Sequence, residues 1–334
     1  MSYEQNVVQR ASARLLRRRE IRERKRYDLE QELYRREPEL RELDRAIRGT
    51  MAELTGLAIG GRPVEAVGPE IADIRRRNLA LQARRAEVLK GLGYEADALD
   101  SKPACALCGD SGWAGSAMCA CLKELCAQEQ MKSLTALLNL TGEQSFDKLR
   151  LDVYSDQPWQ GEGRSPRENM KRVAAVCEGF ARQFPSYPLK NLLLSGGTGL
   201  GKTFLSGCIA REVSERGHSV VYDTAISLFA AFETRKFTRD AAEERQARDD
   251  TRRYLSCDLL ILDDLGSEMT TPLVQSTLYE VVNSRLQADK RTIISTNLSM
   301  EHIAQRYTPQ IVSRIGGLYR ELTFYGQDIR MKRI

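Results

Sequence analysis

The chain has 334 residues, enough for about two domains, and its hydrophobic content of 42% allows it to bury a sizeable core. No stretch approaches the roughly 20 consecutive apolar residues of a membrane span, and the arginine-rich N-terminus lacks the apolar run of a secretory signal. We therefore expect a cytoplasmic protein without a membrane partner. The net charge is +5, and its excess lies between Arg10 and Arg26, where nine basic residues accompany two acidic ones.

Residues 1–100 read as a helical arm. Apolar residues recur at helical spacings over 1–56, and Pro38 should kink this helix or open a second one. A break rich in glycine and proline follows from Gly56 to Pro69. Alternating steps of three and four then place one set of residues on a single seam, as in a coiled coil or helical hairpin. These residues are Ile71, Ile74, Asn78, Leu81, Arg85, Val88 and Leu92.

Two interpretations of this arm remain open. It is either a solvated antiparallel hairpin with no further role, or an arm that binds a protein partner. In the second case the basic run is available to an acidic surface or to nucleic acid.

Four of the eight cysteines are crowded into the pattern Cys105-x2-Cys108-x10-Cys119-x-Cys121. Four thiolates can form a closed tetrahedral zinc site, and in a reducing compartment such crowding indicates a metal rather than disulfides. Cys126 could replace one ligand, but on the expected helix it lies about 140° around the axis from Cys121. We expect a structural zinc module with a helix over 101–140, followed by a linker over 141–164.

Residues 165–334 predict an α/β domain. Ser165-Pro166-Arg167-Glu168 has the form of a capping box that opens a helix reaching about Phe184. Short apolar runs then alternate with helical patterns, which indicates a parallel sheet flanked by helices. The expected strands are 191–195, 219–223, 258–263 and 291–296.

The first of these strands leads into a match to G-x-x-x-x-G-K-[ST]. Glycines allow backbone N–H groups to surround phosphate oxygens, and the lysine places a positive charge on the β- and γ-phosphates. The threonine hydroxyl is a ligand for Mg²⁺, and the helix that begins here directs its positive end at the same anion. The expected ATP-binding residues are Gly196, Gly197, Thr198, Gly199, Leu200, Gly201, Lys202 and Thr203.

A second motif is the hydrophobic strand Leu259–Asp264, which ends in two carboxylates about sixty residues after the loop. Asp263 would bind Mg²⁺ directly or through water, and Asp264 would orient or activate the attacking water. Adjacent buried carboxylates repel one another unless a cation lies nearby, so we do not expect these two aspartates to have only a structural role.

The strand at 291–296 ends in Ser295-Thr296-Asn297. A polar side chain at this point would lie beside the two aspartates, where it could position the water or sense the γ-phosphate. The alternative is an asparagine that merely ends a strand in a turn.

At these residues the chain resembles the bacterial replicative-helicase loaders of the DnaC/DnaI type, a branch of the AAA+ ATPases that includes the transposase helper IstB. The resemblance covers about residues 103–334 and includes Ser313-Arg314-Ile315. It implies an AAA+ fold, a catalytic arginine finger at Arg314 that reaches a neighbouring subunit's nucleotide, and a homo-oligomer with shared ATP sites. Most AAA+ proteins have glutamate where Asp264 stands, and the chain leaves no room for a full helical lid.

The resemblance also implies a helix over 225–237 that faces single-stranded DNA. Phe229, Phe232 and Phe237 would stack on bases, and Arg235 and Lys236 would contact phosphates. The alternative is an ordinary amphipathic helix that packs on the sheet.

We therefore expect an ATP-dependent loader of the replicative DNA helicase that uses ATP, Mg²⁺ and Zn²⁺, binds single-stranded DNA and hydrolyses ATP slowly unless stimulated by DNA or its partner. Two alternatives remain. One is a transposase-helper ATPase of the IstB type, and the other is a zinc-containing adaptor that binds ATP with little hydrolysis.

Overall fold

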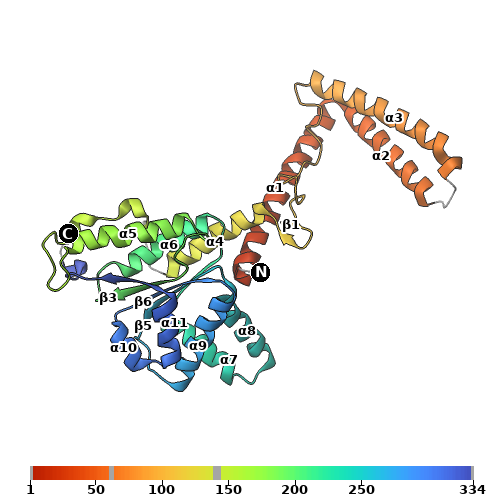
Figure 1. Ribbon diagram of the computed structural model, residues 1–334. Helices are drawn as coiled ribbons and strands as arrows, with labels where there is room; N and C mark the ends of the chain where they lie inside the picture. The colour runs from red at the N-terminus through yellow and green to blue at the C-terminus, as the bar shows by residue number, and fades with distance from the viewer. Residues whose placement is uncertain (1–2, 60–63, 138–143, 332–334) are drawn as a thin grey trace. The chain divides into compact units, whose positions relative to one another are not determined.

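The computed structural model describes residues 3–59, 64–137 and 144–331. The chain forms two compact units (Figure 1). One, called here the core unit, comprises Met1–Ala13 and Met118–Ile334, and the other, the helical unit, comprises Arg14–Ala117. The four-part division expected at residues 100, 140 and 164 stays a prediction. No helix in the described part of the chain is long and apolar enough to cross a membrane.

The helical unit contains an antiparallel hairpin of α2 (Pro38–Ile59) and α3 (Val64–Gly91), preceded by α1 (Gln5–Arg36). The chain breaks at Glu37, and Pro38 begins the second helix as predicted. Ion pairs of 2.7 Å join Arg84 to Glu39 and Arg77 to Glu53, in agreement with the antiparallel arrangement of α2 and α3.

The predicted break from Gly56 to Pro69 is too wide. α2 continues to Ile59, α3 begins at Val64, and Pro69 lies inside α3. Residues 60–63, which belong to the predicted break, lie outside the described residues. Packing of the two helices against each other outweighs the local preference of these glycines and prolines.

A five-stranded parallel sheet with the order β4-β5-β6-β3-β7 forms the centre of the core unit. The strands are β3 (Leu192–Gly196), β4 (Val220–Thr224), β5 (Leu259–Leu265), β6 (Arg291–Thr296) and β7 (Arg320–Phe324). The first four agree with the predicted strands to within two residues. β7, an edge strand that pairs with β3, was not predicted.

Helices cover both faces of this sheet (Figure 1). On one face α5 (Pro166–Arg182) and α6 (Lys202–Glu215) bury Phe180 and Leu205 against the strands, with α4 (Ala120–Leu137) beside α6. The other face is covered by α7 (Ala225–Phe237), α8 (Ala241–Ser256), α9 (Pro272–Gln287), α10 (Met300–Arg306) and α11 (Pro309–Leu318). The predicted capping box at Ser165 and Glu168 is present at the start of α5.

The described part of the predicted linker packs on the core unit. It forms two short helices, η1 (Phe146–Lys148) and η2 (Leu151–Val153), and then buries Tyr154. The Tyr154 hydroxyl donates to the carbonyl of Leu200 at 3.2 Å. This segment therefore packs against the glycine-rich loop through Tyr154.

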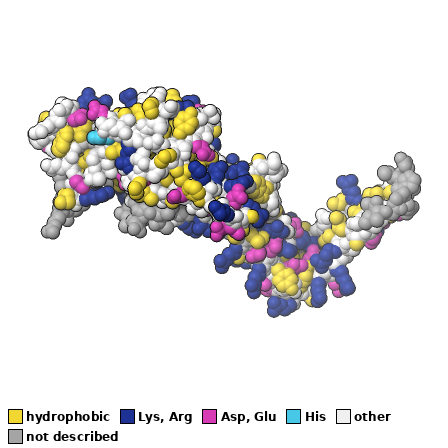
Figure 2. Space-filling view, turned by 90° about the horizontal axis from the view of Figure 1, so that it is seen from below, with side chains coloured by type: hydrophobic (Ala, Val, Ile, Leu, Met, Phe, Trp, Pro, Cys, Tyr) yellow, Lys and Arg dark blue, Asp and Glu magenta, His cyan; other side chains and the backbone are white. Residues whose placement is uncertain are grey.

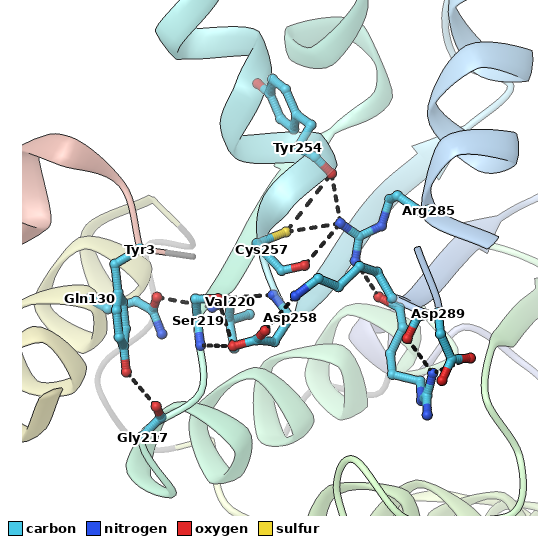
Figure 3. A network of polar contacts seen from close by, with 12 residues as sticks. Tyr3, Gln130, Gly217, Ser219, Val220, Tyr254, Cys257, Asp258, Arg285 and Asp289 are labelled. Atoms are coloured by element: carbon cyan, nitrogen blue, oxygen red, sulfur yellow. Dashed lines mark hydrogen bonds and ion pairs between the residues drawn. The ribbon is translucent and has the colours of Figure 1, made fainter. Parts of the chain in front are cut away.

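Segments far apart in sequence meet at the amino ends of β4 and β5 (Figure 3). The Tyr3 hydroxyl donates to the carbonyl of Gly217 at 2.6 Å, and the Gln130 side chain accepts from the Val220 N–H at 2.9 Å. The fully buried guanidinium of Arg285 donates to carbonyls of Tyr254, Cys257 and Arg291. The core unit therefore includes Tyr3 near the start of the chain and α4, the helix that carries Cys121.

Candidate nucleotide site

The glycine-rich loop connects β3 to α6 and has a backbone shape that side chains would prevent. Gly196, Gly199 and Gly201 have φ values of +141°, +67° and +97°, in the region that favours glycine. A Cβ at Gly196 would also overlap the carbonyl of Phe324. Substitution at these positions would therefore deform the loop and the strand end beside it.

Lys202, the first residue of α6, is buried within this loop. Its ammonium donates to the carbonyls of Gly196 and Gly197 at 2.6 and 2.7 Å, and to Asn297 Oδ1 at 2.8 Å. Burial lowers the pKa of Lys202, while the nearby carboxylates of Asp263 and Asp264 act in the opposite direction. The lysine is thus held at the point where the loop meets the ends of β5 and β6.

A β-bulge places the two aspartates. Leu262 and Leu265 of β5 pair with Ile294 and Thr296 of β6. Between these two pairs β5 therefore has two residues where β6 has one. Successive side chains of a regular strand point to opposite faces, and a bulge breaks this alternation. Asp264 accordingly has a φ of +56°, and both Asp263 and Asp264 line the same cleft.

Hydroxyl groups surround the Asp263 carboxylate. Tyr222 donates to Oδ2 at 2.7 Å, Ser295 donates to Oδ1, and the Thr203 hydroxyl lies 3.4 Å from Oδ2. Burial and the adjacent Asp263 raise the pKa of Tyr222 well above its usual value, so the tyrosine remains a donor. Tyr222 was not predicted as a site residue, because only the pairing of β4 with β5 brings it to this carboxylate.

The side-chain amide of Asn297 connects the lysine with the second aspartate. Its Oδ1 accepts from Lys202 at 2.8 Å, and its Nδ2 donates to Asp264 Oδ1 at 2.8 Å. The two contacts together fix which way the amide faces.

These residues line a cleft of about 450 Å³ at the carboxyl ends of the strands. Nine of the predicted site residues line it: Thr198, Gly199, Leu200, Gly201, Lys202, Thr203, Asp263, Asp264 and Asn297. Gly196 and Gly197 contribute carbonyls to Lys202 instead. The lining also includes Thr224, Phe204, Ile329 and Arg330.

Arg314 is not part of this cleft. Its guanidinium lies 4.6 Å from the ring centre of Tyr279, donates to the Tyr279 hydroxyl at 3.0 Å and to Asn283 Oδ1 at 3.0 Å. The structure therefore places it on α11, outside the nucleotide cleft of its own chain.

The structure corrects part of the expectation for α7. Phe229 and Phe232 are buried in the apolar core between α7 and the sheet, so they cannot stack on bases. Phe237 is 63% exposed, with the ammonium of Lys236 5.9 Å from its ring centre. Helical periodicity alone did not separate the buried aromatic side chains from the exposed one.

The four cysteines of the predicted metal site come together. The Sγ atoms of Cys105, Cys108, Cys119 and Cys121 all lie within 4.8 Å of one another. The Gly112 N–H also points at the Cys108 sulfur, at 3.4 Å. This donor set and spacing fit one tetrahedral zinc ion, whereas buried Cys126 is not part of the cluster.

Asp110 organises the first cysteine pair. Its carboxylate accepts from the N–H groups of Ala104 and Cys105 at 3.0 and 2.8 Å, and it forms an ion pair with Arg22 of α1. Burial tends to raise the pKa of Asp110, but these donors outweigh it and lower the pKa overall. The loop between the cysteines is therefore tied to α1 by a buried carboxylate.

A parallel five-stranded sheet, a glycine-rich phosphate loop and an aspartate pair at the neighbouring strand ends define a P-loop nucleotide-binding domain. Residues 187–314 match the family model of the IstB-like ATP binding proteins. The likeness to this family covers the region that holds the phosphate loop and the aspartate pair.

Similar proteins share this domain at low identity. The replicative helicase loader DnaC of Escherichia coli (strain K12) is 24% identical over 127 residues, 38% of this chain and 50% of the relative. The chromosomal replication initiator protein DnaA of Zymomonas mobilis is 29% identical over 147 residues, 43% of this chain and 29% of that protein. The chain thus spans about half the length of the first relative and less of the second.

Among solved structures, DnaI is 21% identical, with a TM-score of 0.44 over 60% of this chain and all of that chain.

Proposed function

We propose that the protein is an ATP-dependent loader of the replicative DNA helicase and that it hydrolyses ATP in the cleft between the glycine-rich loop and the ends of β5 and β6. The observation that carries the catalytic part is the amide of Asn297, which joins Lys202 to Asp264. Asn297 thereby holds Lys202, which would bind the phosphates, in a fixed position relative to Asp264, which would act on the attacking water.

In this proposal each residue has a separate task. Lys202 binds the β- and γ-phosphates, Asp264 accepts a proton from the attacking water, and Asn297 orients Asp264. Thr203 and Asp263 would hold Mg²⁺, which when bound offsets the phosphate charge. Their oxygens, 3.4 Å apart, are of the type that Mg²⁺ prefers.

The helicase partner is proposed from the 24% identity with the DnaC loader, which is a likeness of the core only. We propose that the arm, residues 1–100, binds the helicase. In the basic run from Arg10 to Arg26, every residue is exposed or half-buried except Ala11 and Leu15. Figure 2 shows Lys and Arg side chains along the helical unit. We assign the binding of single-stranded DNA to Arg235, Lys236 and Phe237, which are all exposed at the end of α7.

Oligomerisation and zinc complete the proposal. Arg314 lies outside its own cleft, so we assign it to the ATP site of a neighbouring subunit in a homo-oligomer. The four clustered cysteines are proposed to bind one structural zinc ion.

A transposase helper is the second candidate, because the matching family model is that of the IstB-like proteins. The two candidates share the ATP site and differ in the protein that the arm recognises.

The deciding experiment is capture from a bacterial lysate by immobilised full-length protein with ATP, with Lys202→Ala as the matched control. Loss of the lysine charge should abolish ATP binding, and we expect the replicative helicase to be retained by the parent in an ATP-dependent manner. Purified helicase and purified transposase should then be tested separately. Retention of the transposase alone would exclude the helicase loader.

Turnover separates an ATPase from an adaptor that only binds ATP. We expect slow hydrolysis that increases with single-stranded DNA or helicase. ATP binding without turnover under any of these conditions would favour the adaptor.

A further inference from the structure

One face of α1 in the helical unit carries a group of exposed cations. Successive residues of a helix lie about 100° apart around its axis, with a rise of about 1.5 Å each. Four exposed side chains therefore fall within an arc of about 120° and an axial length of about 12 Å: Arg17, Arg18, Arg24 and Lys25. The half-buried Arg14 lies in the same arc one turn earlier. These five residues are called here the basic face of α1.

The ion pairs of α1 that lie near this face involve other cations, on other sides of the helix. These pairs are Arg19–Glu23 at 2.7 Å, Arg26–Glu30 at 3.5 Å and Arg22–Asp110.

Among the residues that the structure describes, no carboxylate lies at ion-pair distance from the four exposed cations of the basic face. Asp28 and Glu32 lie in the same arc but beyond Lys25, so they end the basic face. The charge of the four exposed cations is thus available to a partner.

The composition of the basic face favours a phosphate backbone as that partner. The centre of a protein interface is apolar and often aromatic, whereas Ile21 is the one apolar side chain in the arc between Arg14 and Lys25, a stretch that is described throughout. Single strands are bound by aromatic side chains that stack on bases, and Tyr27 lies outside the arc. Arginine, in contrast, offers paired donors that match phosphate oxygens.

The dimensions agree with this partner. Double-stranded DNA carries one negative charge per roughly 1.7 Å of its axis. A rigid helical face about 12 Å long therefore meets several phosphates at once.

We infer that the basic face of α1 binds the sugar–phosphate backbone of double-stranded DNA, independently of sequence and of ATP. The inference goes beyond the proposed function, in which the arm binds the helicase and the end of α7 binds single strands. It gives the protein a contact with the duplex that borders a single-stranded region.

The test measures binding of the full-length protein, without nucleotide, to a fluorescent blunt-ended DNA duplex at salt concentrations from about 50 to 200 mM. Replacement of all four exposed cations of the basic face by glutamine should raise the dissociation constant about 100-fold. It should also reduce the slope of log K against log salt by about 3 to 4, because each cation on a phosphate contributes about 0.9. Replacement of the three arginines by lysine keeps the charge and should retain most of the affinity.

The matched control replaces four exposed arginines elsewhere in the helical unit by glutamine: Arg41, Arg45, Arg48 and Arg75. It removes the same charge and should bind the duplex within a few-fold of the parent. Glutamine is a good helix former, so both glutamine variants should keep the parental melting temperature. An equal loss of affinity in the two variants would overturn the inference, because it would show attraction by net charge alone.

Three further outcomes would overturn the inference. The first is parental duplex affinity in the glutamine variant of the basic face. The second is displacement of the duplex by polyglutamate as readily as by unlabelled duplex of equal charge, which would indicate an acidic protein as the partner. The third is an equal loss of affinity for single strands in that variant, which would remove the assignment to duplex DNA.

Lys202→Ala separates this inference from the proposed function. It should lose ATP binding but bind the duplex like the parent. Failure of the parent to bind ATP or to capture the helicase would overturn the proposed function alone. Failure of the parent to bind the duplex would overturn only the role of α1.

Discussion

Asn297 illustrates how much of the site depends on one side chain. Its amide is bonded on one side to the phosphate-binding lysine and on the other to the aspartate proposed to act on water. Neither contact requires a charge on Asn297, so its role is positional.

Asn297→Ala should therefore leave ATP affinity within a few-fold of the parent and lower the rate of hydrolysis by about 100-fold, the scale of a misplaced general base. Binding by a fluorescent ATP analogue and phosphate release measure the two effects separately. Asn169→Ala, which removes an exposed amide bonded to Thr323, is the control. Unaltered hydrolysis in Asn297→Ala would show that Asp264 does not need this partner.

Asp258 links acidity to the stability of the core unit. Burial raises its pKa, but hydrogen bonds from Lys290 at 2.7 Å and from Ser219 outweigh this effect, so the pKa lies below its usual value. A carboxyl whose pKa is lower in the folded state stabilises that state above the unfolded pKa, near 3.9. This stabilisation is lost as the pH falls through the folded value.

Asp258→Asn should thus lower the free energy of unfolding by about 1–3 kcal/mol at pH 7. The difference from the parent should shrink below about pH 4, where the parent loses the same contribution. Denaturant titrations at pH 7, 5 and 3 measure it, with the exposed Asp249→Asn as control. A difference that is the same at all three pH values would contradict this explanation.

At the scale of the elements, the sequence predicted those features that depend on residues close together in the chain. Apolar runs predicted four strands, and Pro38 and Ser165 predicted where helices begin. β7 was missed because only Leu322 and Phe324 of its five residues are buried. Its strand conformation depends on pairing with β3, which lies more than 120 residues earlier.

In the site, too, local motifs were predicted, whereas features that depend on pairing between distant segments were not. The phosphate loop and the aspartate pair are local motifs and were predicted. The bulge at Asp263 and Asp264 was not, because it is a difference in residue count between two paired strands. Arg330 also lines the cleft, and its segment can approach the loop because Gly199 and Gly326 lack a Cβ that would meet Asp328 and Pro166.

The cysteine cluster can be tested as an element. Cys105→Ser should reduce bound zinc from about one per chain to nearly none and unfold the cysteine module, because metal binding and folding are coupled in such small modules. ATP binding should persist. Metal analysis and nucleotide titration provide the measurements. Cys126→Ala, a change at a buried cysteine outside the cluster, should keep its zinc. Full zinc occupancy in Cys105→Ser would show that the ligand set is different.

At the scale of the whole molecule, Arg314 tests the proposed assembly. Arg314→Ala should retain ATP binding but hydrolyse ATP at least 1,000-fold more slowly, the scale given for a transition-state arginine. Mixing it with Asp264→Asn should restore some activity, because some boundaries then combine an intact arginine with an intact site. Either variant alone serves as the control. Parental hydrolysis in Arg314→Ala would contradict the shared site.

The contribution of residues 3 and 4 to the core unit has a consequence for the order of events during synthesis. Glu4 pairs with Arg253 at 2.7 Å, across 249 positions of the chain. At about 5–20 residues per second, the ribosome delivers Arg253 roughly 12 to 50 seconds after Glu4. During this interval Glu4 lacks its native ion pair with Arg253. The fold of the core unit can be completed only late in translation, and its N-terminal residues remain accessible to chaperones until then.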